Sequence, residues 1–409
     1  SAGRTALIDC TWANLEPQWF DAFLSVLYDF DCYKPEFPHL TDIHVVKKND
    51  EWNRELGELA QSYKWIYFAR DMVNHPPGAK TPEGVASLIK ERVETIPNIT
   101  ASVIAGEAIK EFDLIWRVGK GSPKNPPALL RIEYAPPNEL ANKKPLVLVG
   151  KGVLFDQGGV NAKTNDGDLA TMKLDCSGAM DVAAVIAIAA ELAIPLRIVA
   201  YMPFVVNMLS HEAGLPGDIG RLKDGTTVEI SDTDAEGRLI LIDTVAHAVL
   251  ADSPELVLTL ATLSGNTEGA LGDLAAGVFT DTKSLWNMIE ASAEYTEEHV
   301  AKFPMVRKTF DDLREKKDSA IPAELKNFCH SWPDGDPIRA ACFVLFPAAK
   351  KGISAVNIDI CGPAFIGRPL LWFPEGATGW GIRMLSEFLK RFAKERTKTP
   401  APQSATDSS

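Results

Sequence analysis

From about residue 65 onward, the hydrophobic positions form two alternating kinds of segment. Short, continuous apolar runs at 145–150, 196–203 and 256–262 have the length and composition of buried strands. Longer segments with helical spacing lie between them, such as 178–193 and 236–250. Alternation of strands and helices is typical of a parallel sheet that is covered on both faces. We therefore expect an α/β fold with a mostly parallel, mixed sheet and helices on both faces.

One helix start is marked clearly in the sequence. Thr81 precedes Pro82, and a hydroxyl side chain followed by proline is typical of an N-cap and the first helical position. Apolar residues then follow with helical spacing at Val85, Ile89 and Val93. The sequence therefore predicts a helix that begins at residue 82.

Both ends of the chain differ from its middle. Residues 1–62 alternate less regularly and contain a polar helix candidate near 49–61. Residues 396–409 are polar and contain proline, a composition typical of disordered tails. We therefore expect one large domain over 63–395, a smaller unit before it and a disordered tail after it.

The charge and the cysteines narrow the class of function. A net charge of −13 opposes binding to nucleic acid or to an anionic membrane, which depends on clustered lysine and arginine. Six cysteines are scattered without Cys-x-x-Cys spacing, as expected of reduced thiols. No N-terminal signal is visible, and the longest apolar run, 182–190, is too short to cross a bilayer. We therefore expect a cytoplasmic enzyme without a nucleic-acid or membrane partner.

Acidic residues gather in two stretches. In the first, Asp156 follows a predicted strand and belongs to a glycine-rich loop, where ligands of α/β folds bind. In the second, Asp234 and Glu236 are two residues apart, so in an extended segment both side chains point to one side. Divalent ions prefer carboxylate oxygens, and a two-metal site needs carboxylates that bridge ions about 3.5–4 Å apart. The pattern is compatible with a metal centre.

A simpler interpretation fits each of these features singly. Asp-x-Glu before a helix is common as an N-cap, with its charge at the positive end of the helix dipole. Lys163 is by itself typical of a solvated surface lysine, and the glycines are typical of tight turns. Spacing alone therefore leaves both interpretations open.

Taken together, the two stretches resemble the leucyl aminopeptidase family, the two-metal exopeptidases. Residues 232–239, DTDAEGRL, differ from the family signature only at Asp232, where the family has asparagine. Similar motifs extend over about residues 65–395 and include ARDMVNHPPGAKTPE, VGKGVLFDQGG, MKLDCSGA, PGDI, ATLSG and GATG. The resemblance implies metal-dependent hydrolysis of peptides at a free N-terminus.

The resemblance implies a metal-binding role for five residues. Asp156 and Glu236 match the carboxylates that bridge the two ions, and Asp234 matches a ligand of the more loosely held ion. Lys151 and Asp175 match ligands of the tighter ion. We expect two divalent ions per subunit, Zn or Mn first and Mg or Co next, because carboxylate-plus-amine sites suit all four.

Two further residues match catalytic groups of the family. Lys163 matches the lysine that polarises the scissile carbonyl, and its charge would stabilise the developing oxyanion. Arg238 matches the arginine that holds a bicarbonate ion, which acts there as general base. Lys151 must be a neutral amine to bind a metal, and adjacent dications would lower its pKa.

The chain departs from the family pattern in several places besides Asp232. Ser177 replaces one of two glycines that usually follow the tight-site aspartate. Residues 330–346 replace a glycine-rich stretch and resemble a divergent branch, the probable aminopeptidases. Residues 1–62 match only the end of the family's N-terminal α/β domain, so they form a remnant or a reduced version of it.

The resemblance also implies a pocket for the first side chain of the substrate. Leucine-preferring relatives have methionine at the place of Ala364 and alanine at that of Cys361. The exchange predicts a roomier apolar pocket that accepts methionine and aromatic residues at least as well as leucine, while Asp232 repels acidic residues. The expected pocket residues are Met172, Thr262, Leu263, Gly265, Cys361 and Ala364.

Two other functions remain as alternatives. A catalytically silent relative with a structural or binding role would have no reason to keep all seven metal-binding and catalytic residues. Nucleic-acid binding, which some bacterial relatives show, is opposed by the net charge of −13. The leading interpretation is a metal-dependent aminopeptidase, assembled as a homohexamer because the family assembles in that way.

Overall fold

The structure is a computed structural model of the chain. It describes residues 4–9, 18–30, 32–33, 40–46, 50–137, 143–164, 169–314, 323–328 and 335–398. The four described cysteines are free thiols, and the other two, Cys10 and Cys329, lie outside these ranges. Within these ranges, none of the helices is both long and apolar enough to cross a membrane.

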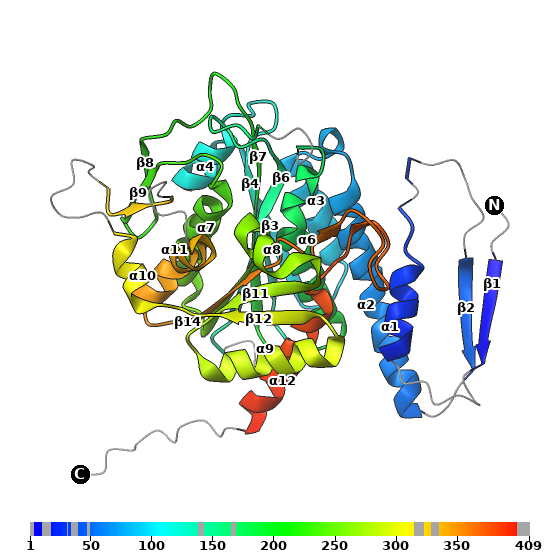
Figure 1. Cartoon of the computed structure of the whole chain (residues 1–409). Helices are drawn as coiled ribbons and strands as arrows, with labels where there is room; N and C mark the ends of the chain where they lie inside the picture. The colour runs from blue at the N-terminus through cyan, green and yellow to red at the C-terminus, as the bar shows by residue number, and fades with distance from the viewer. Residues whose placement is uncertain are drawn as a thin grey trace, which may run out of the picture.

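A nine-stranded sheet runs through the middle of the described chain (Figure 1). Its order is β12-β11-β14-β10-β5-β7-β4-β3, and β6 also pairs with β7. Strands β14, β10, β5 and β7 are parallel neighbours, whereas β4 and β3 add an antiparallel edge and β11 runs antiparallel to β14. This confirms the predicted mixed, mostly parallel sheet. The strands are β3 (Ile99–Ile104), β4 (Ala128–Tyr134), β5 (Leu146–Gly150), β6 (Gly152–Asp156), β7 (Ile198–Asn207), β10 (Leu256–Ala261), β11 (Ala275–Phe279), β12 (His299–Phe303) and β14 (Ser354–Asp359).

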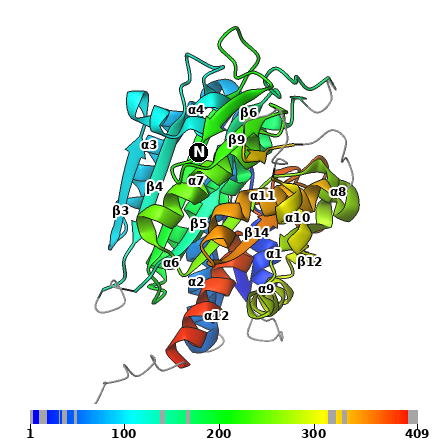
Figure 2. The same cartoon turned by 90° about the vertical axis from the view of Figure 1, so that its left-hand side faces the viewer.

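Helices cover the sheet on both sides. Figure 1 shows α4, α7, α10 and α11 on one side of it and α2, α3, α6 and α12 on the other, and Figure 2 views the molecule from the α7 side. The helices are α1 (Gln18–Val26), α2 (Asp50–Asn74), α3 (Pro82–Val93), α4 (Asp113–Gly119), α6 (Ser177–Glu191), α7 (Glu236–Asp252), α8 (Gly265–Leu271), α9 (Lys283–Thr296), α10 (Arg307–Asp312), α11 (Asp336–Lys350) and α12 (Ile382–Lys398).

The central strands are apolar throughout because both of their faces are buried. In β5, Leu146 and Leu148 belong to the core under α6, while Val147 and Val149 belong to the core under α7. Successive side chains of a strand point to opposite faces, so one apolar run supplies both cores. This explains why the strands read as continuous hydrophobic runs.

Short elements complete the described fold. The predicted N-cap of α3 is confirmed, because the Thr81 hydroxyl accepts a hydrogen bond from the backbone N–H of Gly84 at 3.2 Å. The remaining elements are the strands β8 (Asp218–Arg221), β9 (Thr227–Ile230), β13 (Leu325–Lys326), β15 (Phe365–Ile366) and β16 (Gly376–Ala377), and the 3₁₀ turns η1 (Pro77–Ala79), η2 (Gly106–Glu111), η4 (Met172–Cys176) and η5 (Gly272–Leu274).

Helices of the structure cross both of the predicted domain boundaries. Strands β1 (Arg4–Asp9) and β2 (Leu40–Val46) pair in parallel as a separate two-stranded sheet, beyond α1 and α2 in Figure 1. The predicted boundary at residue 62 falls inside α2, whose second half is packed in the main core. At the other end, α12 runs to Lys398, so the first three residues of the expected disordered tail are helical.

Candidate metal centre

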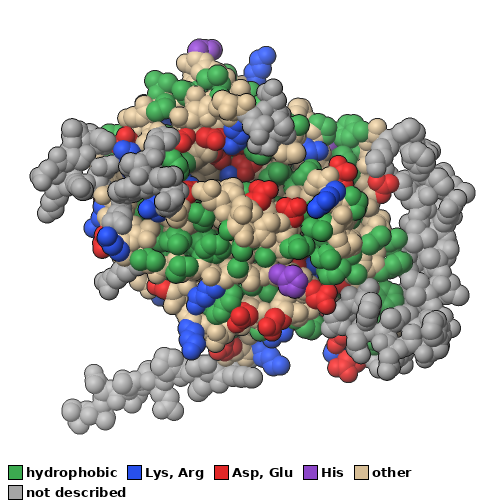
Figure 3. All heavy atoms as spheres, viewed as in Figure 1, with side chains coloured by type: hydrophobic (Ala, Val, Ile, Leu, Met, Phe, Trp, Pro, Cys, Tyr) green, Lys and Arg blue, Asp and Glu red, His purple; other side chains and the backbone are tan. Residues whose placement is uncertain are grey.

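The acidic stretches meet at the carboxyl edge of the parallel strands. Lys151 directly follows β5, Asp156 is the last residue of β6, and Thr262 directly follows β10. Loops at this edge of an α/β sheet are the usual place for a ligand. Here they line a cavity of about 740 Å³. Figure 3 shows acidic and basic side chains around a hollow in the upper half of the face that it views.

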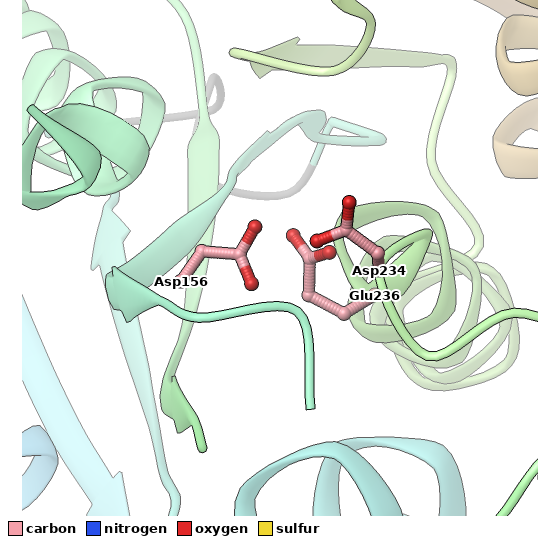
Figure 4. A group of neighbouring side chains, drawn as sticks. All are labelled: Asp156, Asp234 and Glu236. Carbon is pink, nitrogen blue, oxygen red and sulfur yellow. The ribbon is translucent and has the colours of Figure 1, made fainter. Parts of the chain in front are cut away.

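Three carboxylates converge in this cavity. Asp156, Asp234 and Glu236 each offer an oxygen, and these oxygens all lie within 4.8 Å of one another. Figure 4 shows Asp156 at the end of its strand, pointing toward the other two, which come from the start of α7. Like charges this close repel strongly unless cations lie among them. The cluster therefore favours bound positive charge.

A buried lysine lies on the more buried side of the carboxylate cluster, which we call the inner side. The Lys151 Nζ atom donates to Asp175 Oδ1 at 2.6 Å and to the Thr262 carbonyl oxygen at 2.8 Å. It also lies 3.0 Å from Glu236 Oε1. Burial lowers the pKa of Lys151, but the carboxylates of Asp175, Glu236 and Asp156 outweigh it, so the pKa lies above its usual value.

A second lysine occupies the outer side. The Lys163 Nζ atom lies 2.6 Å from Asp234 Oδ1 and 2.8 Å from Asp156 Oδ2. Its pKa is lowered by burial and raised more strongly by Asp156 and Glu236, so it also lies above the usual value. The simple expectation of a solvated surface lysine is therefore wrong for Lys163, because its side chain is only 20% exposed and faces the acids.

Burial and neighbouring charges also shift the pKa values of the acids. Burial, together with the charges of Asp156 and Glu236, raises the pKa of Asp234 to about 7. Burial raises the pKa of Asp175 well above its usual value, although the Lys151 ammonium opposes this. For Glu236, the two lysine ammonium groups outweigh burial and lower the pKa. Two ammonium groups thus face four carboxyl groups, and the raised pKa values of Asp175 and Asp234 show that ionising all four is unfavourable without further positive charge.

The donor set fits divalent ions. Among the described side chains of this cavity, Asp175 Oδ2 is a buried carboxylate oxygen without a hydrogen-bond donor. A buried charged oxygen without a partner is costly, and hard divalent cations take carboxylate oxygens and amines as ligands. Lys151, Asp156, Asp175, Asp234 and Glu236 are the residues that would hold them.

One glycine of the signature is required by close packing. A side chain at Gly237 would place its Cβ atom 2.7 Å from Lys151 Nζ and 2.4 Å from Lys151 Cε. Real Cβ contacts are not that short, so any larger residue would push the lysine away from its carboxylates. The glycine after Glu236 therefore keeps the inner lysine in place.

The start of α7 differs from both interpretations of the Asp-x-Glu spacing. The N-cap residue is Ala235, and it makes no side-chain capping hydrogen bond. Glu236 is the first helical residue, and a turn precedes it, so the extended geometry expected for Asp234 and Glu236 is wrong. The two carboxylates still converge, because the turn brings Asp234 back over the helix end (Figure 4).

Two residues that the sequence analysis missed hold the acidic loops together. The Asn207 amide donates to Asp156 Oδ1 at 2.8 Å and to the Thr233 carbonyl oxygen at 3.0 Å. The Thr233 hydroxyl donates to the Gly158 carbonyl oxygen at 2.7 Å. Asn207 closes strand β7, so its place at the carboxyl end of a central strand was the available signal.

Arg238 faces the same cavity and is paired with an acid that the sequence analysis also missed. Its Nη1 and Nη2 atoms each lie 3.0 Å from one oxygen of Asp336. Nη1 also donates to the Asn327 carbonyl oxygen at 3.0 Å. Asp336 is the first residue of α11 and lies in the segment 330–346 that departs from the family pattern.

Most of the expected specificity residues line the cavity. Met172, Thr262, Leu263, Gly265 and Cys361 are among its lining residues. Ala364 is not among them, because its side chain is packed in the hydrophobic core. The neighbouring Phe365 lines the cavity instead, together with the acids Asp232, Glu268 and Asp273.

The fold and the donor set together define an α/β protein with a cluster of carboxylates and lysines, suited to divalent ions, at the edge of its sheet. Residues 67–386 match the family model described as the cytosol aminopeptidase family, catalytic domain. The chain therefore belongs to the cytosol aminopeptidase family, a family of peptide hydrolases, and the resemblance found in the sequence is confirmed.

Individual relatives support this assignment. The chain is 33% identical over 326 residues to the probable cytosol aminopeptidase 1 of Shewanella oneidensis, covering 79% of this chain and 62% of that protein. It is 33% identical over 377 residues to the human cytosol aminopeptidase, covering 90% of this chain and 69% of that protein. The chain thus spans about two thirds of the length of these relatives.

A solved structure is similar over nearly the whole chain. The bottromycin maturation enzyme BotP in complex with Mn is 31% identical, with a TM-score of 0.84. The match covers 95% of this chain and 84% of that one. The fold class predicted from the sequence is thereby confirmed.

Proposed function

We propose that this protein is a two-metal aminopeptidase that removes the first residue from peptides with a free N-terminus. The observation that carries the proposal is the convergence of Asp156, Asp234 and Glu236 within 4.8 Å beside Lys151 and Lys163. Bound divalent ions lower the pKa of a bound water toward about 7 and polarise a carbonyl group.

The chain's own residues divide the work between them. Asp156 and Glu236 would bridge the two ions, Lys151 and Asp175 would complete the inner site, and Asp234 would complete the outer site. Lys151 must release its proton to act as a ligand, although in this structure Asp175 and Glu236 hold that proton in place. We expect Zn or Mn, and next Mg or Co, as the bound ions. Mn is the metal in the solved BotP complex.

Lys163 supplies the positive charge on the substrate side. Its ammonium group lies between Asp156 and Asp234 and is partly open to solvent, so it can reach a carbonyl oxygen in the cavity. A charge fixed there stabilises the oxyanion that forms when the carbonyl is attacked. Arg238 holds an anion beside this centre. The resemblance implies that this anion is bicarbonate, acting as general base, whereas in this structure the Asp336 carboxylate pairs with both terminal nitrogens of Arg238.

The lining residues support a preference for neutral first residues. Met172, Leu263, Cys361 and Phe365 provide apolar walls. Acidic substrates would meet the carboxylates of the same cavity and be repelled. One methylene in such a pocket changes discrimination by about 1–3 kcal/mol, so we expect a broad preference in which methionine and phenylalanine are accepted at least as well as leucine.

A panel of aminoacyl amides tests the activity. With added Mn or Zn, methionine, phenylalanine and leucine amides should be cleaved, while the same amides with an acetylated amino group should not. A chelator should abolish turnover, and added metal should restore it. If none of the amides were cleaved with any of the four metals, the chain would be a catalytically silent relative.

Assembly and location follow from the family resemblance alone. We propose a cytoplasmic homohexamer that acts without nucleic acid or membrane. Light scattering of the purified protein should give six times the mass of one chain. A particle with the mass of one chain would contradict the hexamer.

A further inference from the structure

Arg238 and Asp336 form a closed ion pair on the wall of the cavity. Both oxygens of the Asp336 carboxylate lie 3.0 Å from terminal nitrogens of the guanidinium, one to each nitrogen. Both residues are buried, with 4% of Arg238 and 8% of Asp336 exposed. A two-point pair of this kind is the strongest and most directional that arginine makes.

The surroundings fix this pair in place. The Ser264 hydroxyl donates to Asp336 Oδ2 at 3.1 Å, and the Asn327 carbonyl oxygen accepts from Arg238 Nη1 at 3.0 Å. The Arg238 guanidinium also lies over the Phe328 ring, with 5.6 Å from its central carbon to the ring centre. The carboxylate therefore has a built seat with three donors from two side chains.

The local backbone supports the same orientation. Asp336 opens α11, preceded by Gly335 with φ +74° and followed by Pro337. A left-handed residue there favours glycine, and proline is favoured in the first turn. No side chain caps this helix, so the Asp336 oxygens serve Arg238 and Ser264 rather than the helix end.

We propose that Asp336 is a resident anion, which occupies the Arg238 guanidinium in place of an exchangeable bicarbonate ion. A carboxylate and a bicarbonate share a planar pair of oxygens and one negative charge, so they compete for the same two nitrogens. Asp336 is thus a positioning residue: it holds Arg238, which follows the bridging Glu236 by two residues, beside the metal centre. The inference rests on the proposed aminopeptidase function for its kinetic part only.

The binding part is tested without turnover. Removing the side chain with Asp336→Ala should expose the guanidinium, and calorimetry should then detect one formate or bicarbonate ion per chain. The wild type and Asp336→Asn, whose amide still fills the seat, should bind neither ion. Asp224→Ala is the matched control, because it removes another acid paired with α11, through Lys350, outside the cavity.

The kinetic part uses the same variants in buffer freed of carbon dioxide. Wild-type turnover should be unchanged when bicarbonate is added. Asp336→Ala should lose about 10–100-fold in kcat, as is typical when a residue that orients a metal centre is removed. Formate should raise the kcat of Asp336→Ala at least tenfold without changing its KM. It should not raise the kcat of Asp336→Asn.

Several outcomes would overturn the proposal. One is bicarbonate binding or bicarbonate activation of the wild type. Another is an Asp336→Ala protein that binds neither ion. A third is an Asp336→Ala protein in which formate raises the melting temperature but not kcat, because the pair of Arg238 with Asp336 would then stabilise the fold without acting on the reaction. If Asp336→Ala does not fold, the wild-type and Asp336→Asn measurements still decide. If no variant has peptidase activity but Asp336→Ala binds formate, the proposed function fails and the resident anion stands.

Discussion

The inner and outer halves of the metal centre are built from the same residue types in different surroundings. On the inner side, the side chains of Lys151 and Asp175 are 5% and 7% exposed. On the outer side, those of Lys163 and Asp234 are 20% and 34% exposed. Asp175 belongs to η4 and Lys151 follows β5, and both pairs line the same cavity, so the inner pair is its more deeply buried part.

The difference in exposure predicts a difference in affinity. A buried acid such as Asp175 cannot replace a lost cation with water, and its Oδ2 atom has no donor among the described residues. An acid such as Asp234 exchanges its partner for water at low cost. The inner ion should therefore bind more tightly and the outer ion more loosely, while Glu236 and Asp156 between them should serve both.

The largest effect is expected from the shared carboxylate. Glu236→Ala should abolish binding of both ions and reduce activity to the level of the chelated wild type, because Glu236 is only 1% exposed and pairs with Lys151. Elemental analysis after gel filtration, with activity on methionine amide, measures this. Retention of both ions by a folded variant would show that Glu236 does not bridge.

A matched pair of variants separates the two halves. Asp175→Asn should lose the inner ion and all activity at any practical metal concentration. Asp234→Asn should lose only the outer ion, and excess metal should restore activity. Calorimetric titration of both variants in parallel measures their metal affinities. Equal losses of affinity in the two variants would show that the inner and outer sites do not differ.

A smaller effect is expected from the outer lysine. Lys163→Ala should keep both ions but lose about 10²–10³ in kcat, because a single group that stabilises developing charge contributes that much. Lys223→Ala is the control, since it removes a lysine paired with the exposed Glu111. Wild-type kcat in Lys163→Ala would show that its role is wrongly assigned.

The last effect is on stability rather than activity and concerns a buried acid away from the metal centre. Asp243, in α7, accepts hydrogen bonds from the backbone N–H groups of Leu114 and Ile115, yet burial raises its pKa to about 7. An unfolded aspartate has a pKa of about 3.9. Between these pH values the folded state holds a proton that the unfolded state has lost, so the stability that this proton provides is lost as pH rises.

Asp243→Asn should remove this part of the pH dependence. Relative to the variant, the wild type should lose on the order of 4 kcal/mol of unfolding free energy between about pH 4 and pH 7. Urea unfolding of both proteins at several pH values measures it. A constant difference across that range would mean that Asp243 is ionised throughout, held by its two N–H donors.

The sequence predicts the framework because each central strand is apolar on both faces and each flanking helix has its own spacing. The α3 cap follows from Thr81 and Pro82, and the convergence of Asp156 with Glu236 follows from the signature stretches. Arg238 and Asp336 are 98 residues apart in the sequence, and Asp336 lies in a segment outside the family pattern. Local sequence patterns therefore could not predict this pair. Likewise, the core position of Ala364 depends on tertiary packing.

Titration of the chelated protein with Mn or Zn tests the central claim most directly. Calorimetry with elemental analysis should show two ions per chain, the first bound more tightly, with activity that follows occupancy of the second. A single ion at saturation, or full turnover in the metal-free protein, would contradict the two-metal account.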